Sequence, residues 1–298
     1  QTPIRRQTDY DSPDLSLSTE GVYWGETDEG LEETTELAKS VGIQTVLKPH
    51  IWLTQPRDGK WRTDIEMRSE RDWKTWFANY RNFILHYARF AEAHHIPILC
   101  VGTELQTTAV KRPQDWRQLI GEIRQVYSGH LTYAANWYQA LEEIPFWDDL
   151  DFIGIQAYFP LTDTVQPSLD ELKAGWREHL PAIEAVHNQY QKPVIFTELG
   201  YRSADDAAIE PWQWPDANSE EQSTATTASA LATQANCYEA FFQTVWPQDW
   251  LAGVYIWKWF PKIQPTSAPI GQGFTPQNKP AEQVMQAWYE RTLRENAT

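Results

Sequence analysis

The 298-residue sequence is 41% hydrophobic and 22% charged, proportions that are typical of a folded globular protein and not of a disordered chain. Its 41 acidic and 25 basic residues give a net charge of -16, so a phosphate backbone would be repelled and we expect no nucleic-acid partner. The two cysteines, Cys100 and Cys237, lie far apart, which excludes a disulfide framework and a zinc site built from paired cysteines. No apolar run reaches the length of a membrane span, and nothing in the sequence indicates a compartment.

Short apolar runs alternate with amphipathic helical stretches along most of the chain. The predicted strands are, in chain order, Gln44–Pro49, Ile98–Glu104, Leu131–Asn136, Phe152–Tyr158, Val194–Glu198 and Gly253–Trp257. The predicted helices are Glu70–His94, Asp115–Tyr127, Leu169–Gln189 and Thr226–Thr244, in which apolar residues recur at spacings of three and four. Strands that alternate with such helices predict a parallel sheet with helical crossovers.

Two α/β folds fit this alternation, a (β/α)8 TIM barrel and an open doubly wound sheet. The doubly wound sheet usually has a glycine-rich phosphate loop after an early strand, and neither GxGxxG nor GxxxxGK[ST] occurs here. We therefore expect residues 1–298 to form one catalytic domain with the barrel fold. Only six strand–helix units are recognisable where a closed barrel has eight. Either the barrel is incomplete at its N-terminus, or residues 1–30, which are polar and rich in turns, contain the missing units in a form that the pattern does not reveal.

Two segments show neither the apolar runs of a strand nor the helical spacing of apolar residues, and they are expected to be loops. Ala204–Thr227 is rich in small and acidic residues, and Lys262–Pro280 is rich in proline and glycine. Each follows a predicted strand, so each is expected at the carboxyl-terminal face of the barrel, where active sites are built.

A glutamate stands at the end of two different predicted strands. Glu104 follows the apolar run that begins at Ile98, and Glu198 follows the run that begins at Val194. Hydrolysis of a glycosidic bond requires two carboxyl groups, one that protonates the leaving oxygen and one that attacks the anomeric carbon. Two separate barrel strands can support such a pair rigidly. We therefore interpret Glu104 and Glu198 as the catalytic residues.

Polar and aromatic side chains accompany these glutamates at the strand ends. Asn, Lys, His and Thr can hydrogen-bond sugar hydroxyls, whereas Trp and Tyr offer flat faces on which pyranose rings stack. The candidate substrate-binding residues are Lys48, His50, Trp52, Thr103, Asn136, Trp137, Tyr158, Tyr201 and Trp257. Packing or local hydrogen bonding would explain any one of them, but together they indicate a carbohydrate site.

The two glutamates and the residues around them resemble those of glycoside hydrolase family 113, the β-1,4-mannanases. This family belongs to a large clan of retaining (β/α)8 glycosidases. The resembling segments are LKPHIWL at 47–53, DGKWR at 58–62, VGTEL at 101–105, LTYAANW at 131–137, FWDDLDFIGIQAYFPL at 146–161, KPVIFTELGY at 192–201 and GVYIWKW at 253–259. The resemblance implies that Glu104 is the acid/base and Glu198 the nucleophile. It also implies that Tyr158 hydrogen-bonds the nucleophile.

The sequence departs from the family's pattern in three places. If Gln44–Pro49 corresponds to the third strand of the family, the first strand is missing and Gln1–Gln7 is at best the tail of the second. The wider clan has Asn before its acid/base, where it binds the sugar 2-hydroxyl, but here Thr103 has a shorter side chain that cannot reach as far. Gln156 stands where relatives often carry an acid.

The expected activity is that of an endo-β-1,4-mannanase, which hydrolyses internal β-1,4 links of mannan or a related β-glycan with retention. The expected partner is a β-linked oligo- or polysaccharide. The alternatives are another β-glycan hydrolase of the same clan and a non-catalytic carbohydrate-binding barrel. We expect no cofactor and no metal site, because the sequence contains no cofactor motif and its histidines lack a ligand-like spacing. Membrane and protein partners are not indicated, and endo or exo action stays open.

Overall fold

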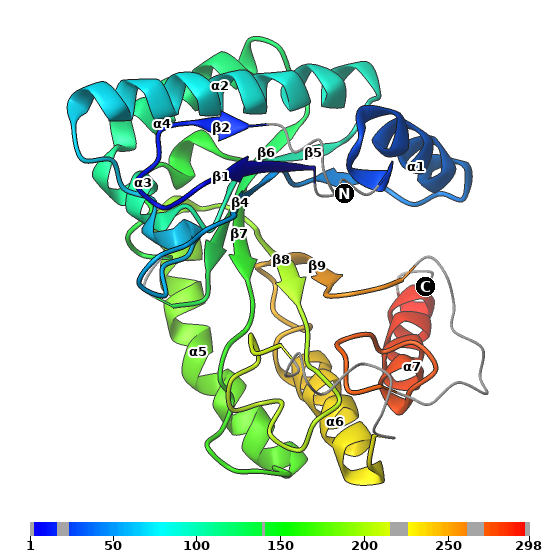
Figure 1. The fold of residues 1–298 in the computed structure, drawn as a ribbon. Helices are drawn as coiled ribbons and strands as arrows, with labels where there is room; N and C mark the ends of the chain where they lie inside the picture. The colour runs from blue at the N-terminus through cyan, green and yellow to red at the C-terminus, as the bar shows by residue number, and fades with distance from the viewer. Residues whose placement is uncertain (1–2, 17–23, 139–140, 215–225, 261–270, 296–298) are drawn as a thin grey trace. The chain divides into compact units, whose positions relative to one another are not determined.

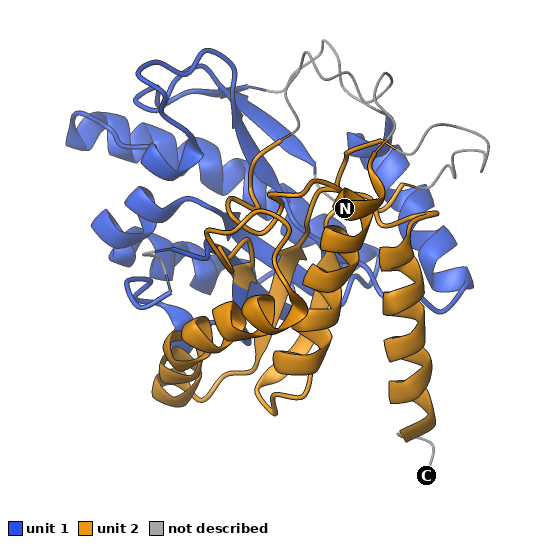
Figure 2. Cartoon of the chain, turned by 90° about the horizontal axis from the view of Figure 1, so that it is seen from below, with its two compact units in different colours: residues 1–154 blue, residues 155–298 orange. Residues whose placement is uncertain are grey.

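The computed structural model describes residues 3–16, 24–138, 141–214, 226–260 and 271–295 (Figure 1). The chain divides into two compact units, residues 1–154 and residues 155–298, which are coloured separately in Figure 2. No helix among the described residues is both long and apolar enough to cross a membrane.

The main sheet has the strand order β3-β5-β6-β7-β8-β9, so it advances in one direction along the chain. These strands are β3 (Val46–Leu47), β5 (Ile98–Thr103), β6 (His130–Asn136), β7 (Phe152–Gln156), β8 (Val194–Leu199) and β9 (Leu251–Ile256). The pairs β3–β5, β5–β6 and β8–β9 are parallel. A doubly wound sheet would reverse its order at a switch point, whereas a (β/α)8 barrel does not. The fold class predicted from the sequence, part of a (β/α)8 barrel, is confirmed.

Helices follow most of these strands, as parallel pairing requires. Between β6 and β7 the described residues contain only a 3₁₀ turn. The helices are α1 (Asp28–Ser40), α2 (Glu70–Ala93), α3 (Gln106–Lys111), α4 (Pro113–Arg124), α5 (Leu169–Tyr190), α6 (Ala228–Thr244) and α7 (Pro280–Glu295). Short 3₁₀ turns are η1 (Trp24–Glu26), η2 (Arg62–Asp64) and η3 (Trp147–Asp149). The long helices start at hydroxyl caps, since Ser69 accepts from the Asp72 amide and Ser168 accepts from the Glu171 amide.

The N-terminal residues contain a strand that the sequence did not reveal. β1 (Ile4–Gln7) pairs in parallel with β4 (His50–Leu53) and antiparallel with β2 (Leu15–Ser16). β1 is polar, and its Gln7 is fully buried. The burial is tolerated because Gln7 Oε1 accepts from the Trp76 indole nitrogen at 2.9 Å and Gln7 Nε2 donates to the Asp9 carbonyl oxygen at 2.8 Å. Of the two alternatives that the sequence left open, residues 1–30 therefore do contain a strand that the pattern did not reveal, and it lies within Gln1–Gln7.

The predicted strand Gln44–Pro49 is also corrected, because the structure has two short strands in this region. β3 pairs with β5, whereas β4 pairs with β1, and Lys48 and Pro49 lie between them. Proline has no N–H to give to a ladder, which suits the point where the chain changes partners.

The core of residues 1–154 is built from the aromatic face of α2. Trp76 and Tyr80 are stacked with their ring centroids 5.0 Å apart, and Trp116 of α4 stacks on Phe146 at 5.5 Å. Each large apolar side chain buried in this way contributes about 1.5–3 kcal/mol. Gly102 on β5 makes room for this packing, because a Cβ there would lie 2.6 Å from the Trp116 ring.

In residues 155–298 the core lies between β8 and the helices α5 and α6. Trp176 and Phe196 are stacked with centroids 6.0 Å apart, and Phe241 packs against both rings. At the end of β8, a Cβ on Gly200 would lie 2.2 Å from the Trp257 carbonyl oxygen. Glycine therefore lets the ends of β8 and β9 approach closely. Of the two predicted loops, residues 215–225 and 262–270 lie outside the described residues. The described parts of both loops contain no helix or strand except at Pro280, where α7 begins.

Candidate active site

Glu104 comes directly after β5, and its backbone conformation is unusual for a residue with a side chain. Its φ of 54° lies in the left-handed region, which costs on the order of 1 kcal/mol for residues other than glycine. The Glu104 amide donates to the Ala134 carbonyl oxygen on β6 at 2.9 Å, so the neighbouring strand holds the turn in place. Backbone strain collects at functional sites, where the surrounding structure over-determines it. Glu104 is thus held in a left-handed turn at the carboxyl end of β5.

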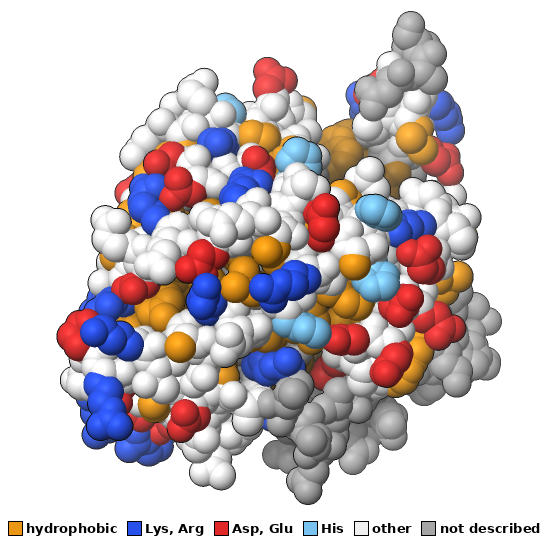
Figure 3. Space-filling view, turned by 90° about the horizontal axis from the view of Figure 1, so that it is seen from above, with side chains coloured by type: hydrophobic (Ala, Val, Ile, Leu, Met, Phe, Trp, Pro, Cys, Tyr) orange, Lys and Arg blue, Asp and Glu red, His pale blue; other side chains and the backbone are white. Residues whose placement is uncertain are grey.

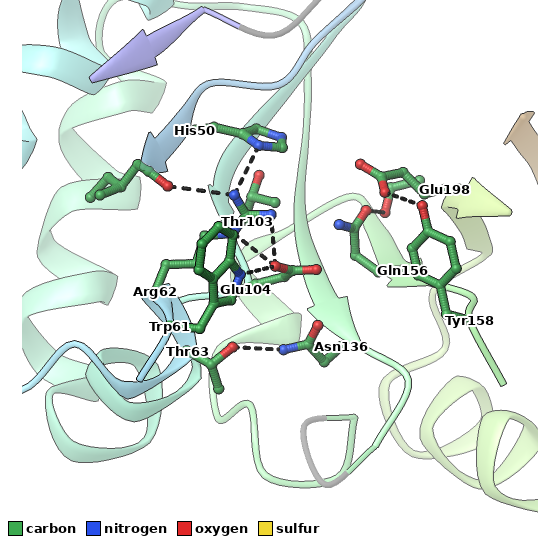
Figure 4. Close-up of polar contacts among 12 residues, drawn as sticks. His50, Trp61, Arg62, Thr63, Thr103, Glu104, Asn136, Gln156, Tyr158 and Glu198 are labelled. Carbon is green, nitrogen blue, oxygen red and sulfur yellow. Dashed lines mark hydrogen bonds and ion pairs between the residues drawn. The ribbon is translucent and has the colours of Figure 1, made fainter. Parts of the chain in front are cut away.

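The carboxylate of Glu104 is contacted by three nitrogen atoms of one loop (Figure 4). Arg62 Nε donates to Glu104 Oε2 at 2.7 Å, and Arg62 Nη2 forms an ion pair with the same oxygen at 2.7 Å. Trp61 Nε1 donates to Oε2 as well, at 3.3 Å. The Arg62 and Glu104 side chains are only 7% and 12% exposed, so water screens the pair little. A fixed cation thus holds one of the two carboxylate oxygens of Glu104.

Arg62 also contacts His50, so its guanidinium lies between that ring and Glu104 (Figure 4). Arg62 Nη1 is 3.3 Å from His50 Nδ1 and 3.5 Å from the Ile51 carbonyl oxygen. Burial, together with the charges of Arg62 and Lys48, holds the pKa of His50 well below its ordinary value of 6.5. His50 is therefore neutral, and because Nδ1 faces a donor, we place its proton on Nε2. His50 Nε2 is buried and has no hydrogen-bond partner within the residues that the structure describes.

Three more candidate residues of this unit are buried beside Glu104 or at the ends of the neighbouring strands. Asn136, the last residue of β6, donates from Nδ2 to the Thr63 hydroxyl at 3.0 Å. Thr103 is 1% exposed and its hydroxyl donates to the Pro49 carbonyl oxygen at 3.4 Å, so this hydroxyl is already engaged. Lys48 follows β3 and is 6% exposed. Each lies at the carboxyl end of a strand, as the sequence predicted.

Aromatic side chains of the same unit are more exposed. Trp52 on β4 is 41% exposed, and its ring meets the Trp61 ring edge to face at 4.8 Å. Arg62 lies over the Trp61 ring at 5.0 Å. Trp137, which follows β6, packs edge to face on Tyr138 at 5.2 Å. Exposed indole faces of this kind can stack on a sugar ring.

In residues 155–298, Glu198 lies on β8 and is 6% exposed. The Tyr158 hydroxyl donates to Glu198 Oε2 at 2.6 Å (Figure 4). The Ala157 amide donates to the Glu198 carbonyl oxygen at 2.7 Å. Beside them, the Thr197 hydroxyl donates to Gln156 Oε1 at 3.2 Å, which orients the Gln156 amide. The contact between Tyr158 and Glu198 is the one that the sequence led us to expect.

Trp257 follows β9 and belongs to an aromatic group on the same unit. Its ring lies 6.3 Å from that of Trp214, edge to face, and Lys258 Nζ lies 5.0 Å from the Trp214 ring. Trp214 is 57% exposed and Trp259 is 50% exposed.

Tyr201 differs from the other candidates because its side chain is fully buried. Its ring packs edge to face on Tyr238 at 5.6 Å, and burial raises the pKa of Tyr201 well above its ordinary value. Tyr201 belongs to the core of residues 155–298, so we do not include it among the proposed sugar contacts.

Trp61, Arg62 and Thr63 are the residues of the site that the sequence did not single out. They lie on η2 and in the loop before it. The glutamates were selected because they stand at the ends of predicted strands, and these three residues do not. The available signal was the segment DGKWR at 58–62, in which a Trp–Arg pair follows a turn. Among the described residues, no group of three or more His, Cys, Asp or Glu side chains could hold a metal ion.

Comparison with known proteins places the chain among carbohydrate-active enzymes. The model of Glycoside Hydrolase Family 113 matches residues 6–294. A solved complex of a GH113 β-1,4-mannanase is 30% identical, with a TM-score of 0.80 over 97% of this chain and 86% of that chain. The GH113 β-mannanase of Alicyclobacillus acidocaldarius in complex with ManMIm is 28% identical, with a TM-score of 0.79 over 97% of this chain and 86% of that chain.

A more distant likeness concerns the fold alone. The β-D-glucuronidase of Dictyoglomus thermophilum is 18% identical, with a TM-score of 0.56 over 87% of this chain and 42% of that chain. None of the curated proteins compared with the chain matches it.

Proposed function

Because the chain belongs to Glycoside Hydrolase Family 113, it is a glycoside hydrolase, and we propose that it is an endo-β-1,4-mannanase that works by double displacement with retention. The observation that carries this proposal is the similarity to two β-mannanase structures, at TM-scores of 0.80 and 0.79 over 97% of the chain. The buried glutamates at two strand ends support the mechanism.

In this proposal Glu198 is the nucleophile. A nucleophile must be ionised when it attacks the anomeric carbon, and the hydroxyl of Tyr158 donates to Glu198 at 2.6 Å. A hydrogen bond to the charged form of a carboxyl group favours that form. Tyr158 also fixes which way the carboxylate points, because its hydroxyl holds one oxygen.

Glu104 is the acid/base of the same reaction. In the first step it protonates the leaving oxygen while Glu198 attacks, which forms a glycosyl-enzyme intermediate. In the second step Glu104 accepts a proton from water, which attacks the anomeric carbon and releases Glu198. Glu104 must therefore exchange one proton in each direction per turnover. A side chain in a fixed orientation suits this role, because the reacting groups must stay aligned in both steps.

The sugar contacts are proposed from the carboxyl ends of β3, β6 and β9 and from two residues of β4, His50 and Trp52. Lys48, His50 and Asn136 offer polar groups, and Trp52, Trp137 and Trp257 offer flat faces for stacking. His50 is suited to a hydroxyl acceptor, since its buried Nε2–H has no partner among the described residues. Thr103 is less suited, because its hydroxyl is engaged by Pro49.

The proposal is tested by reducing-sugar release from mannan, glucan and xylan by the wild-type protein and by Glu104→Ala and Glu198→Ala. We expect turnover on mannan, a loss of about 100- to 10,000-fold for Glu104→Ala and no measurable turnover for Glu198→Ala. Glu66→Gln, at a carboxyl group that is 45% exposed, is the control and should keep full activity. Mannan binding without turnover by the wild-type protein would instead support the carbohydrate-binding alternative.

A further inference from the structure

We propose that Arg62 and Trp61 form a positioning device for Glu104, which assigns the two carboxylate oxygens different tasks. This inference rests on the proposed function of Glu104 as acid/base. In it, Oε2 is the oxygen that the loop holds, and Oε1 is the oxygen that carries the proton to and from the reacting atoms. Arg62 and Trp61 act through Glu104 and do not themselves take part in the proton transfer.

The assignment follows from the number of donors on one atom. Arg62 Nε, Arg62 Nη2 and Trp61 Nε1 lie 2.7, 2.7 and 3.3 Å from Glu104 Oε2. A carboxylate oxygen has two lone pairs, so three N–H groups occupy its acceptor capacity. A proton on Oε2 would have to displace at least one of these donors and face a guanidinium that cannot lose its own proton. Protonation on Oε1 leaves all three contacts in place.

The device is in place before any sugar binds, because the loop that carries it is tied to its own unit. The Trp61 amide donates to Asp64 Oδ2 at 2.9 Å, and the Asp64 amide donates to the Trp61 carbonyl oxygen at 2.9 Å. Lys60 forms an ion pair with Asp64 at 3.0 Å, and Arg57 pairs with Asp11 at 2.8 Å on the turn after β1. A preorganised donor set costs no reorganisation when the reaction occurs.

The far side of Arg62 is equally fixed. Its Nη1 contacts the His50 ring and the Ile51 carbonyl oxygen on β4. Because His50 is neutral, its ring does not repel the Arg62 guanidinium, and the ion pair with Glu104 is the charged contact that the guanidinium makes here. Lysine could supply the charge but not the planar fork of donors that reaches Glu104, His50 and Ile51 together.

The test compares substrates that differ in their need for an acid. A manno-oligosaccharide has a poor leaving group, so its glycosidic oxygen must be protonated. A dinitrophenyl β-mannoside releases dinitrophenolate, which is a good leaving group and departs without protonation. For Arg62→Gln we expect kcat/KM on the oligosaccharide to fall about 100-fold, and kcat/KM on the aryl mannoside to change by less than about threefold. Azide should raise kcat on the aryl mannoside, since it can attack the intermediate without a base. Arg62→Lys should lie between the wild-type protein and Arg62→Gln.

The double variant Glu104→Ala/Arg62→Gln decides whether Arg62 acts through Glu104. If it does, the double variant is no slower than Glu104→Ala, because the group being positioned is already gone. Losses that multiply, or equal losses of Arg62→Gln on both substrates, would overturn the inference and assign Arg62 to sugar binding or to the fold. If Glu104→Ala itself keeps full turnover, the proposed function fails instead, so the two failures can be told apart.

One further measurement and two further variants, Trp61→Phe and Arg81→Gln, distinguish an effect on Glu104 from a loss of folding. Arg62 is buried, so thermal unfolding of Arg62→Gln is measured beside its kinetics. Trp61→Phe removes one donor and keeps an aromatic ring over which Arg62 lies, so it should show the same substrate preference with a smaller loss. Arg81→Gln is the control for a surface arginine, since Arg81 pairs with Glu122 and is 52% exposed. An unchanged preference in Trp61→Phe would remove Trp61 from the device.

Discussion

The Tyr158 hydroxyl gives Glu198 a hydrogen bond whose loss can be measured by itself. Tyr158→Phe removes only the oxygen that lies 2.6 Å from Glu198 Oε2. A hydrogen bond to a charged group contributes about 1.5–3 kcal/mol, which corresponds to roughly 10- to 100-fold in rate if it is lost from the transition state. We expect kcat/KM on manno-oligosaccharides to fall by that factor.

A matched control exists in the core. The Tyr127 hydroxyl donates to the Ile96 carbonyl oxygen at 2.7 Å and is remote from both glutamates in sequence and role. Tyr127→Phe should lower the free energy of unfolding by about 1 kcal/mol and leave kcat/KM unchanged. Equal activity losses in Tyr127→Phe and Tyr158→Phe would mean that the loss reports general loosening and not the support of a nucleophile.

His50 links the stability of the protein to pH. Its pKa in the folded chain lies well below 6.5, because it is buried and because Arg62 and Lys48 carry positive charge nearby. Between that lowered value and 6.5, the unfolded chain binds a proton that the folded chain does not bind. The free energy of unfolding should therefore fall as the pH drops below 6.5, by at most about 1.4 kcal/mol per pH unit from this group.

His50→Gln removes this titration and keeps a polar side chain. Urea unfolding at about pH 7 and about pH 5 should show a smaller loss of stability for His50→Gln than for the wild-type protein. His86→Gln is the control, since His86 is 45% exposed and pairs with Asp28 at the surface. If His50→Gln and the wild-type protein lose the same stability over this interval, His50 is protonated in the folded chain.

Among the elements, the sequence revealed those with a strongly buried face. α2 was predicted as Glu70–His94 and observed as Glu70–Ala93, because its aromatic residues recur at helical spacing and are buried together. α1 and α7 were not predicted, since each buries few side chains, which in α1 are Gly30, Leu31 and Thr35. In α7 the buried residues are Ala281 and Met285. A helix that is mostly solvated leaves a weak pattern in its sequence.

The end of β9 is where the stacking role of tryptophan can be tested. β9 ends at Ile256, so Trp257 lies at the strand end and not within the ladder, and its ring is partly exposed beside Trp214. Trp257→Ala should lower kcat/KM by one to two orders of magnitude, about 1.4–2.8 kcal/mol, while Tm moves little. Trp259→Ala, at a ring that is 50% exposed, is the comparison variant. If Trp257→Ala unfolds the protein, Trp257 is a core residue and the sugar platform lies elsewhere.

At the scale of the whole molecule, the candidate site was predicted from the residues at the carboxyl ends of the strands, and the same approach missed residues on loops. Residues at the carboxyl ends of parallel strands share one edge, so Glu104 and Glu198 could be chosen from the sequence alone. Arg62 could not be chosen, because its position depends on how a loop folds back. Tyr201 was included because it follows a strand, but the chain turns it into the core, where it meets Tyr238. Strand ends are predictable from periodicity, whereas loop conformations depend on tertiary contacts.

The surface charge fits the neutral polysaccharide that is proposed as the substrate. The chain carries a net charge of -16, and on the face in Figure 3 acidic and basic side chains are interspersed. A neutral polysaccharide is neither attracted nor repelled by such a surface, whereas a polymer rich in carboxylates would be repelled.

The stereochemistry of the proposed reaction depends on the role of Glu198, and it can be measured directly. Retention requires the two carboxyl groups to be about 5–5.5 Å apart, so that Glu198 reaches the anomeric carbon directly. Inversion requires about 6.5–9.5 Å, which leaves room for a water molecule between carboxylate and sugar. We expect proton NMR of the first minutes of manno-oligosaccharide hydrolysis to show the β-anomer of the new reducing end, before mutarotation produces the α-anomer. An α-anomer formed first would keep both residues but make Glu198 a general base, and a covalent intermediate trapped on Glu198 with a 2-deoxy-2-fluoro mannoside would exclude that outcome.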